Sequence, residues 1–203
     1  MWRTTLLNHT YTFESIKEIL AKANEEKSGD MLAGIGARTA AERVAAKVVL
    51  ADLTLEELRK NPVVPEEEDE ISRLSQEQID EEAYQKIKAM TVGEFREFLL
   101  SAETAEIEGI RDGLTPEMIA AAAKLMSNMD LVTTAAKIPV TATCNTTIGE
   151  KGVFAGRLQP NHARDDVEGI MASVYEGISY GVGDAVIGLN PVADNVDTTV
   201  QLL

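Results

Sequence analysis

The chain has 203 residues, of which 44% are hydrophobic and 26% charged, as in typical globular proteins. Its 34 acidic and 19 basic residues give a formal net charge of −15, and no basic cluster stands out. Because phosphate backbones and anionic lipids repel such a chain, we expect neither nucleic acid nor a membrane as a partner. The single cysteine, Cys144, excludes an intramolecular disulfide and a Cys-rich metal site.

The start of the chain and its hydropathy argue against export. The opening residues, MWRTTLLNHTYTF, are too short and too polar for a secretory signal. No apolar run approaches the roughly 18 residues that a membrane-spanning helix needs. We therefore expect a cytoplasmic protein.

Helical patterns fill most of the first 130 residues, after a strand-like lead at 4–7. Apolar residues three and four apart predict a helix over 13–27, ended by Ser28-Gly29-Asp30. Further helices are predicted over 38–53, 54–61, 75–90, 95–101, 104–111 and 115–128, with a capping box of Ser75 and Gln78 and a helix start at Thr115-Pro116. The buried stripe of the helix over 38–53 is expected to comprise Ala41, Val44, Ala45, Val48 and Val49.

Gly34 and Gly36 lie just before a predicted helix, where glycines can form a backbone cradle for phosphate. The pattern lacks a third glycine and a clear preceding strand, so it matches neither the dinucleotide-binding nor the P-loop motif. We favour a tight turn. Five consecutive acids at 66–70 are similarly expected to form a solvated loop or helix start rather than a cation site.

The character of the chain changes after residue 135, where a β-prone segment at 139–144 follows the helical pattern. We predict a helical N-terminal region over 1–130 and an α/β region over 131–203. The expected fold class is α/β and helix-rich overall.

Residues 151–191 predict a strand over 153–158, a helix capped by Asp165 and Glu168, and a second strand over 185–189. Arg157 and Gln159 close the first strand, and Asn190 closes the second. In a right-handed βαβ unit both parallel strands end at the same edge of the sheet. We therefore expect these three side chains to face one another.

Arg157 offers a planar fork of donors, while Gln159 and Asn190 can both donate and accept. The three side chains suit a small polar molecule that bears hydroxyl or amine groups. None of them is a good general base, nucleophile or metal ligand, so a cofactor would have to supply the bond breaking. The alternative is a structural role, in which Arg157 pairs with Asp165 or Asp166 to hold a loop.

Two other reactive residue types carry no clear role. Cys144 has no histidine nearby in the sequence, so a nucleophilic role lacks support. His162 lies beside the polar cluster, but its role cannot be assigned from spacing. The sequence therefore assigns no catalytic residue and no metal ligand.

Seven segments distributed along the chain form a recognisable series: LAKANEEKSGDMLAG, AAERVAAKVVLADLT, LSAETA, NTTIG, GRLQPN, RDDV and YEGISYGVGDAVIGLNPV. They resemble the N-terminal part of the large subunit of ethanolamine ammonia-lyase, an adenosylcobalamin-dependent family. They follow one another in the family's order, and the last is the most specific.

The resemblance implies a helical N-terminal region followed by the first strands and helices of a (β/α)8 TIM barrel. It implies substrate contacts for Arg157, Leu158, Gln159 and Asn190, and a corrin contact for Pro191. The implied reaction converts ethanolamine to acetaldehyde and ammonia by a radical mechanism with adenosylcobalamin. The implied partners are a small subunit and further large subunits, in the cytoplasm or a bacterial microcompartment.

The family's large subunit is more than twice as long as this chain, so the resemblance implies an incomplete barrel. An open barrel exposes a sheet edge and apolar faces, and we expect the chain alone to be inactive and only marginally stable. One alternative is a non-catalytic assembly fragment that pairs with a separate chain completing the barrel. Another is an unrelated barrel enzyme that uses Arg157 to bind phosphate or carboxylate.

Overall fold

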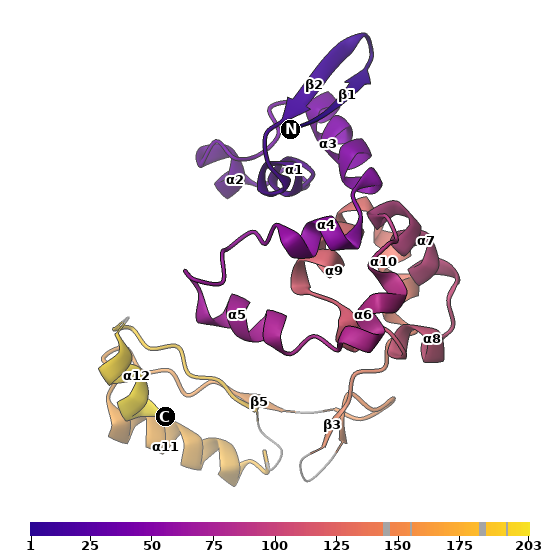
Figure 1. The fold of residues 1–203 in the computed structure, drawn as a ribbon. Coiled ribbons are helices and arrows are strands. Elements are labelled where there is room, and N and C mark those ends of the chain that lie inside the picture. The colour runs from indigo at the N-terminus through magenta and orange to yellow at the C-terminus, as the bar shows by residue number, and fades with distance from the viewer. Residues whose placement is uncertain (144–146, 155, 183–185, 194) are drawn as a thin grey trace. The chain divides into compact units, whose positions relative to one another are not determined.

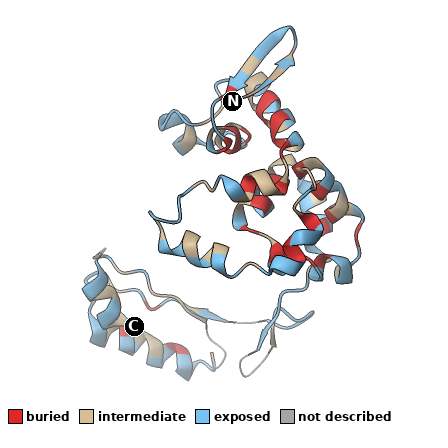
Figure 2. Ribbon diagram, viewed as in Figure 1, coloured by how far each residue is buried: buried red, intermediate tan, exposed pale blue. Residues whose placement is uncertain are grey.

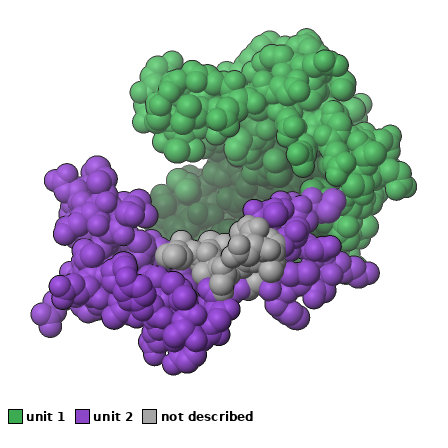
Figure 3. Space-filling model, turned by 90° about the horizontal axis from the view of Figure 1, so that it is seen from below, with its two compact units in different colours: residues 1–138 green, residues 139–203 purple. Residues whose placement is uncertain are grey.

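The computed structural model describes residues 1–203 with the exception of 144–146, 155, 183–185 and 194 (Figure 1). The chain forms two compact units, Met1–Ile138 and Pro139–Leu203, which Figure 3 distinguishes by colour. The predicted division at 130/131 falls inside helix α10 (Asn128–Ala135), which belongs to the first unit.

The first unit begins with an antiparallel hairpin, in which β1 (Trp2–Leu6) pairs with β2 (His9–Phe13). Leu7 and Asn8 form the turn, with left-handed φ angles of 51° and 62°. The predicted strand at 4–7 is confirmed in the main, but the helix predicted over 13–27 begins too early. Alternating polar and apolar residues extend β2 to Phe13, and Ser15 then caps the helix by accepting the Glu18 N–H at 3.1 Å.

Short helices make up the rest of this unit. They are α1 (Ile16–Lys22), α2 (Ser28–Leu32), α3 (Ala40–Asp52), α4 (Leu55–Lys60), α5 (Glu70–Glu77), α6 (Glu81–Ile87), α7 (Val92–Ser101), α8 (Thr104–Glu108), α9 (Pro116–Leu125) and α10, with a 3₁₀ turn η1 (Arg111–Gly113). The stop predicted at Ser28-Gly29-Asp30 is wrong, since α2 begins there.

Side-chain caps determine where several of these helices begin. Thr54 with Glu57 and Thr91 with Glu94 form capping boxes, and Thr115 caps α9 one residue before its proline. The single helix predicted over 75–90 is wrong, because Ser75 lies inside α5 and Asp80 caps a separate helix, α6.

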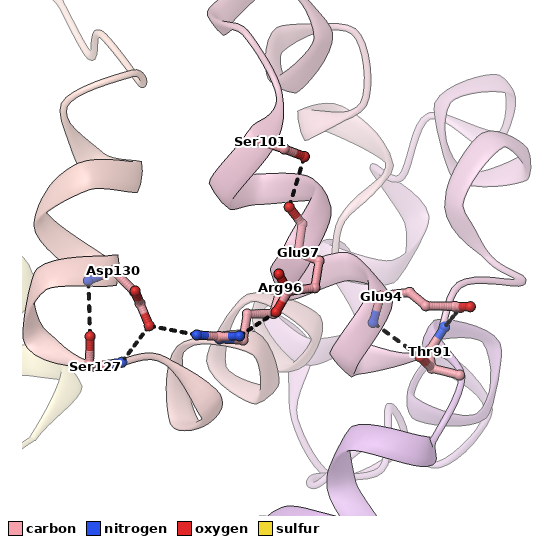
Figure 4. A network of polar contacts seen from close by, with 7 residues as sticks. All are labelled: Thr91, Glu94, Arg96, Glu97, Ser101, Ser127 and Asp130. Carbon is pink, nitrogen blue, oxygen red and sulfur yellow. Dashed lines mark hydrogen bonds and ion pairs between the residues drawn. The ribbon is translucent and has the colours of Figure 1, made fainter.

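The helix predicted over 115–128 also divides in two. It ends at Leu125, and Ser127 begins α10 by a capping box with Asp130. Figure 4 shows that Arg96 on α7 reaches this cap, with its Nη2 atom 2.8 Å from Oδ2 of Asp130. The pKa of the Asp130 carboxyl is lowered first by the Ser127 N–H and then by the Arg96 side chain.

Buried side chains from the hairpin and the helices form one apolar core in the first unit (Figure 2). The buried face of α3 is Ala45, Ala46, Val49 and Leu50. Val44 and Val48, which were predicted to be buried, are 46% and 42% exposed. The face is thus rotated by about one residue, because α1, α7 and the hairpin pack on the Ala46 and Leu50 side.

The second unit contains very short strands. β3 (Ala142–Thr143) pairs antiparallel with β4 (Thr147–Ile148), and β5 (Arg157–Leu158) pairs parallel with β6 (Val186–Ile187). Helix α11 (Val167–Ser179) connects β5 to β6, and α12 (Val196–Leu202) follows. The predicted parallel β–α–β order is confirmed, whereas Val153 and Phe154 lie outside the first strand.

Some predictions for this unit fall on residues outside the described part of the chain. These include Cys144, the first two residues of the NTTIG segment, and residue 185 of the predicted second strand. The cap predicted for α11 is wrong by one residue, since Asp166 caps the helix by accepting the Gly169 N–H at 2.8 Å.

Candidate functional site

The carboxyl ends of β5 and β6 meet at one edge of their small parallel sheet. Arg157 lies opposite Val186 and Leu158 opposite Ile187, and the Gly188 N–H donates to the Leu158 carbonyl at 2.9 Å. Gln159 and Asn190 therefore follow the two paired strands at the same edge. The expected placement of both strand ends is confirmed.

The Arg157 side chain crosses from the end of β5 to the end of β6. A Cβ atom added at Gly188 would lie only 2.7 Å from Nη2 of Arg157 and 3.1 Å from its Nε atom. The guanidinium thus covers the Gly188 backbone, two residues before Asn190. A larger residue at position 188 would displace it.

The described residues do not show the ion pair by which Arg157 was alternatively expected to hold a loop. Arg157 forms no ion pair with Asp165 or Asp166 in the part of the chain that the structure describes. Asp166 caps α11, and Asp165 accepts backbone N–H groups of the loop after β6. Both carboxylates therefore have other structural tasks.

Leu158 points away from Arg157 and packs on α11. A Cβ atom at Gly177 would lie 2.7 and 2.9 Å from the two δ carbons of Leu158. Successive side chains of a strand lie on opposite faces, so Arg157 and Gln159 share the other face. The substrate contact predicted for Leu158 stays a prediction, and its side chain serves to pack the helix.

The loop after β5 holds the segment that follows β6. Oδ1 of Asn161 accepts the Asn190 N–H at 3.1 Å. Asp165 accepts the Val192 N–H at 2.8 Å and the Ala193 N–H at 2.8 Å. The pKa of the Asp165 carboxyl is lowered, first by the Ala193 N–H and then by the Val192 N–H.

His162 stabilises this loop. Its Nδ1 atom accepts the N–H groups of Arg164 at 3.3 Å and Asp166 at 3.4 Å. Its ring packs on Gly169, where an added Cβ atom would lie 2.8 Å from Cδ2. His162 also lines an open cavity of about 700 Å³, whose wall contains none of Arg157, Gln159 or Asn190.

The turn at Gly34 is confirmed as structural. Gly34 has a left-handed φ angle of 70°, and the N–H groups of Ile35 and Gly36 both donate to the Asp30 carbonyl at 3.1 and 3.2 Å. Because these two donors are already used, they cannot form a phosphate cradle.

The described residues contain no group of three or more His, Cys, Asp or Glu side chains that could hold a metal ion. No helix in the same residues has the length and apolar character needed to cross a bilayer.

Comparison with known sequences identifies the family. The family model described as "Ethanolamine ammonia lyase large subunit (EutB)" matches residues 11–203. The chain belongs to the ethanolamine ammonia-lyase large-subunit family. The resemblance carried by the sequence segments is therefore confirmed.

Relatives in this family give the extent of the match. The ethanolamine ammonia-lyase large subunit of Escherichia coli (strain K12) is 51% identical over 203 residues, covering 99% of this chain and 45% of that protein. The large subunit of Salmonella typhimurium (strain LT2) gives the same identity and coverage. The chain thus spans less than half the length of these ethanolamine ammonia-lyase large subunits.

The sequence did not predict the hydrogen bonds that the Asn161 and Asp165 side chains accept from the backbone after β6. The partners are 29 and 27 residues apart, so no local pattern connects them. One signal was available: Pro191 has no N–H, and the donors beside it need acceptors from elsewhere in the chain.

Proposed function

We propose that this chain forms part of an ethanolamine ammonia-lyase and supplies one wall of the ethanolamine site. In this proposal the wall consists of Arg157, Gln159 and Asn190. The observation that carries it is the position of the Arg157 guanidinium over Gly188, at the sheet edge where Asn190 follows. In parallel α/β folds, ligands bind at this carboxyl edge of the strands.

The chemistry of the wall suits a small amino alcohol. Arg157 has donors alone, so it would bind the hydroxyl oxygen of ethanolamine, while a neighbouring ammonium group would be repelled. The amide oxygens of Gln159 and Asn190 can accept from that ammonium group or from the hydroxyl. Both amides and the guanidinium are on exposed residues of the described structure.

The same residues fit a cofactor that performs the bond breaking, because the wall offers grip and orientation without a base or nucleophile. When bound, adenosylcobalamin supplies radical chemistry to this family's reaction. Pro191, half-buried directly after Asn190, would contact the corrin ring. Asn161 and Asp165 hold the backbone on both sides of that proline.

We further infer that the second unit is the start of a (β/α)8 barrel. Parallel strands joined by a helix are the repeating unit of that fold. Apolar residues remain exposed on α11 and α12, among them Met171, Tyr175, Ile178, Val196 and Val200. A helix that is apolar on its outer side is normally buried, which supports a further polypeptide surface over this unit.

The experiment that tests this function reconstitutes the assembly. The chain is co-expressed with a polypeptide matching the remaining 55% of the relatives' length and with a small subunit, then supplied with adenosylcobalamin. Acetaldehyde formed from ethanolamine is measured for the unchanged chain, for Arg157→Ala, and for Arg3→Ala as a matched control in β1.

We expect turnover by the unchanged assembly and by Arg3→Ala. Loss of a charged hydrogen bond costs about 1.5–3 kcal/mol, so Arg157→Ala should lower kcat/KM by roughly 10- to 100-fold. Equal turnover by Arg157→Ala, or none by the unchanged assembly, would refute the proposal. Ammonia release by the 203-residue chain alone would refute the need for a completing surface.

A second candidate is an assembly fragment without catalysis, which the exposed apolar residues of α11 and α12 also favour. In that case the chain should bind the completing polypeptide as one stable complex on size exclusion. It should then give no turnover and no ethanolamine binding. Turnover that depends on Arg157 would exclude this candidate.

A further inference from the structure

We propose that Asn161 and Asp165 are positioning residues, which fix the backbone around Asn190 and so hold its side chain at the substrate wall. This inference rests on the proposed function for the role of Asn190. The clamp itself, defined as Asn161 and Asp165 bound to the backbone of residues 190–193, stands on the geometry alone.

The clamp accounts for every backbone donor in its segment. Asn190 donates to Asn161, and Val192 and Ala193 donate to Asp165, at 3.1, 2.8 and 2.8 Å. A second contact joins the Val192 N–H to Oδ2 of Asp165 at 3.0 Å. Pro191 has no N–H to donate.

The backbone of Asp165 explains why this residue type suits the position. Its φ angle is 54°, in the left-handed region that Asp and Asn tolerate better than other non-glycine residues. Its own N–H donates to the His162 carbonyl at 3.2 Å, and the His162 ring accepts the N–H groups of Arg164 and Asp166. Hydrogen bonds within the loop therefore hold it in place independently of its contacts with residues 190–193.

An ionised carboxylate is the acceptor that best serves two adjacent N–H groups, since charge-assisted hydrogen bonds are roughly twice as strong as neutral ones. The lowered pKa of Asp165 agrees with this geometry. Loss of the charge should therefore release Val192 and Ala193 and let Asn190 shift relative to Arg157.

The first measurement uses the 203-residue chain and follows amide hydrogen exchange at Val192 and Ala193 by NMR. Asp165→Asn keeps a residue that tolerates the left-handed backbone but removes the charge. Asp165→Gly removes the side chain without creating backbone strain. Glu168→Gln is the control with the same change in charge, because Glu168 lines the same open cavity as His162 and Asp165.

We expect exchange at Val192 and Ala193 to accelerate about tenfold in Asp165→Asn and further in Asp165→Gly, with no change in Glu168→Gln. The amides of α11 report whether each variant folds, and Asp165→Asn alone suffices if the glycine variant does not. Unchanged protection in Asp165→Asn, or unprotected amides in the original chain, would overturn the clamp.

The second measurement uses the reconstituted assembly and separates KM from kcat for ethanolamine. A misplaced Asn190 weakens binding of substrate and transition state alike, so we expect KM to rise about five- to tenfold in Asp165→Asn while kcat changes less than about threefold. Glu168→Gln should match the original assembly in both constants.

The two measurements distinguish failure of the clamp from failure of the proposed function. Altered amide exchange in an assembly that never converts ethanolamine would refute the proposed function and leave the clamp standing. Altered exchange with unchanged KM, in an assembly that Arg157→Ala inactivates, would refute the positioning role and leave the proposed function standing.

Discussion

The two compact units of this chain are stabilised in different ways. Among the described residues, the buried apolar side chains lie in the first unit, with the exception of Pro160 in the loop after β5 and Ile170 on α11 (Figure 2). The second unit instead depends on hydrogen bonds between its loops and on one lightly covered helix. The first unit thus contains its own core, whereas the second supports our proposal that another surface completes it.

The largest effect should come from the core of the first unit. Phe95 on α7 is fully buried, so Phe95→Ala should lower the free energy of unfolding by about 3–5 kcal/mol through lost burial and a cavity. Val48→Ala, on the exposed side of α3, is the control and should change stability by less than about 0.5 kcal/mol. Urea unfolding followed by far-UV circular dichroism measures both. A small effect at Phe95 would mean that the first unit lacks the compact core described above.

Replacing a glycine with alanine in each unit tests how tightly that unit is packed. At Gly113 an added Cβ atom would lie 2.4 Å from the Tyr84 backbone nitrogen, so Gly113→Ala must move η1 away from α6. Such overpacking costs about 1–3 kcal/mol. At Gly177 the added atom would meet the flexible end of Leu158, and Gly177→Ala should cost less. Thermal unfolding of both variants ranks them, and the reverse order would contradict the comparison.

Lys137, near the end of the first unit, binds backbone carbonyls at the C-terminal end of α7. Its Nζ atom donates to the carbonyls of Leu100 at 2.6 Å and Ala102 at 3.0 Å, which lie at and beyond the end of α7. Lys137→Met keeps the apolar stem and leaves these carbonyls without their partner, so stability should fall by about 1–2 kcal/mol. Lys60→Met, in an exposed ion pair with Glu56, should have almost no effect on the urea midpoint.

A smaller effect should appear as a dependence on pH. Burial raises the pKa of Glu42, but hydrogen bonds from Lys22 at 2.7 Å and from the Arg38 N–H outweigh it, and the pKa is lowered overall. Glu42 therefore stabilises the fold above the unfolded value of about 4.3, and this contribution is lost as the pH falls through the folded pKa.

Glu42→Gln should make the urea midpoint fall less steeply as the pH is lowered. Glu56→Gln should change this slope much less, because solvent screens its exposed pair with Lys60, although that pair also lowers the pKa of Glu56. Lys22, the basic partner of Glu42, affects stability at high pH. The pKa of Lys22 is raised, because hydrogen bonds to Glu42 and Glu18 outweigh its burial. Its contribution is therefore lost as the pH rises through the folded pKa. A slope at low pH that Glu42→Gln does not alter would contradict this assignment.

Local signals in the sequence were enough to predict several helix starts and the parallel β–α–β order. Thr54 and Thr115 cap helices through contacts three residues away, which a sequence pattern contains. The helix predicted over 95–101 in fact begins at Val92, directly after its cap Thr91. The phase of α3 could not be predicted in the same way. Its alanines and valines are apolar on more than one side, and the neighbouring helices decide which side is buried.

The candidate site also has features that the sequence predicts and features that it does not. The positions of Arg157 and Asn190 at one sheet edge follow from the parallel topology, so they could be predicted. The clamp from Asn161 and Asp165 could not, because it depends on loop geometry between residues far apart in the chain. The packing of Arg157 over Gly188 is likewise a tertiary contact.

The contrast between the two units is tested most directly by amide hydrogen exchange in the chain alone and in the reconstituted assembly. We predict that amides of the first unit, such as those of Leu50 and Phe95, are protected equally in both samples. Amides of α11, such as that of Ile170, should gain at least about tenfold protection in the assembly, where another surface covers them. Equal protection of α11 in both samples would contradict the claim that the second unit is completed by another polypeptide.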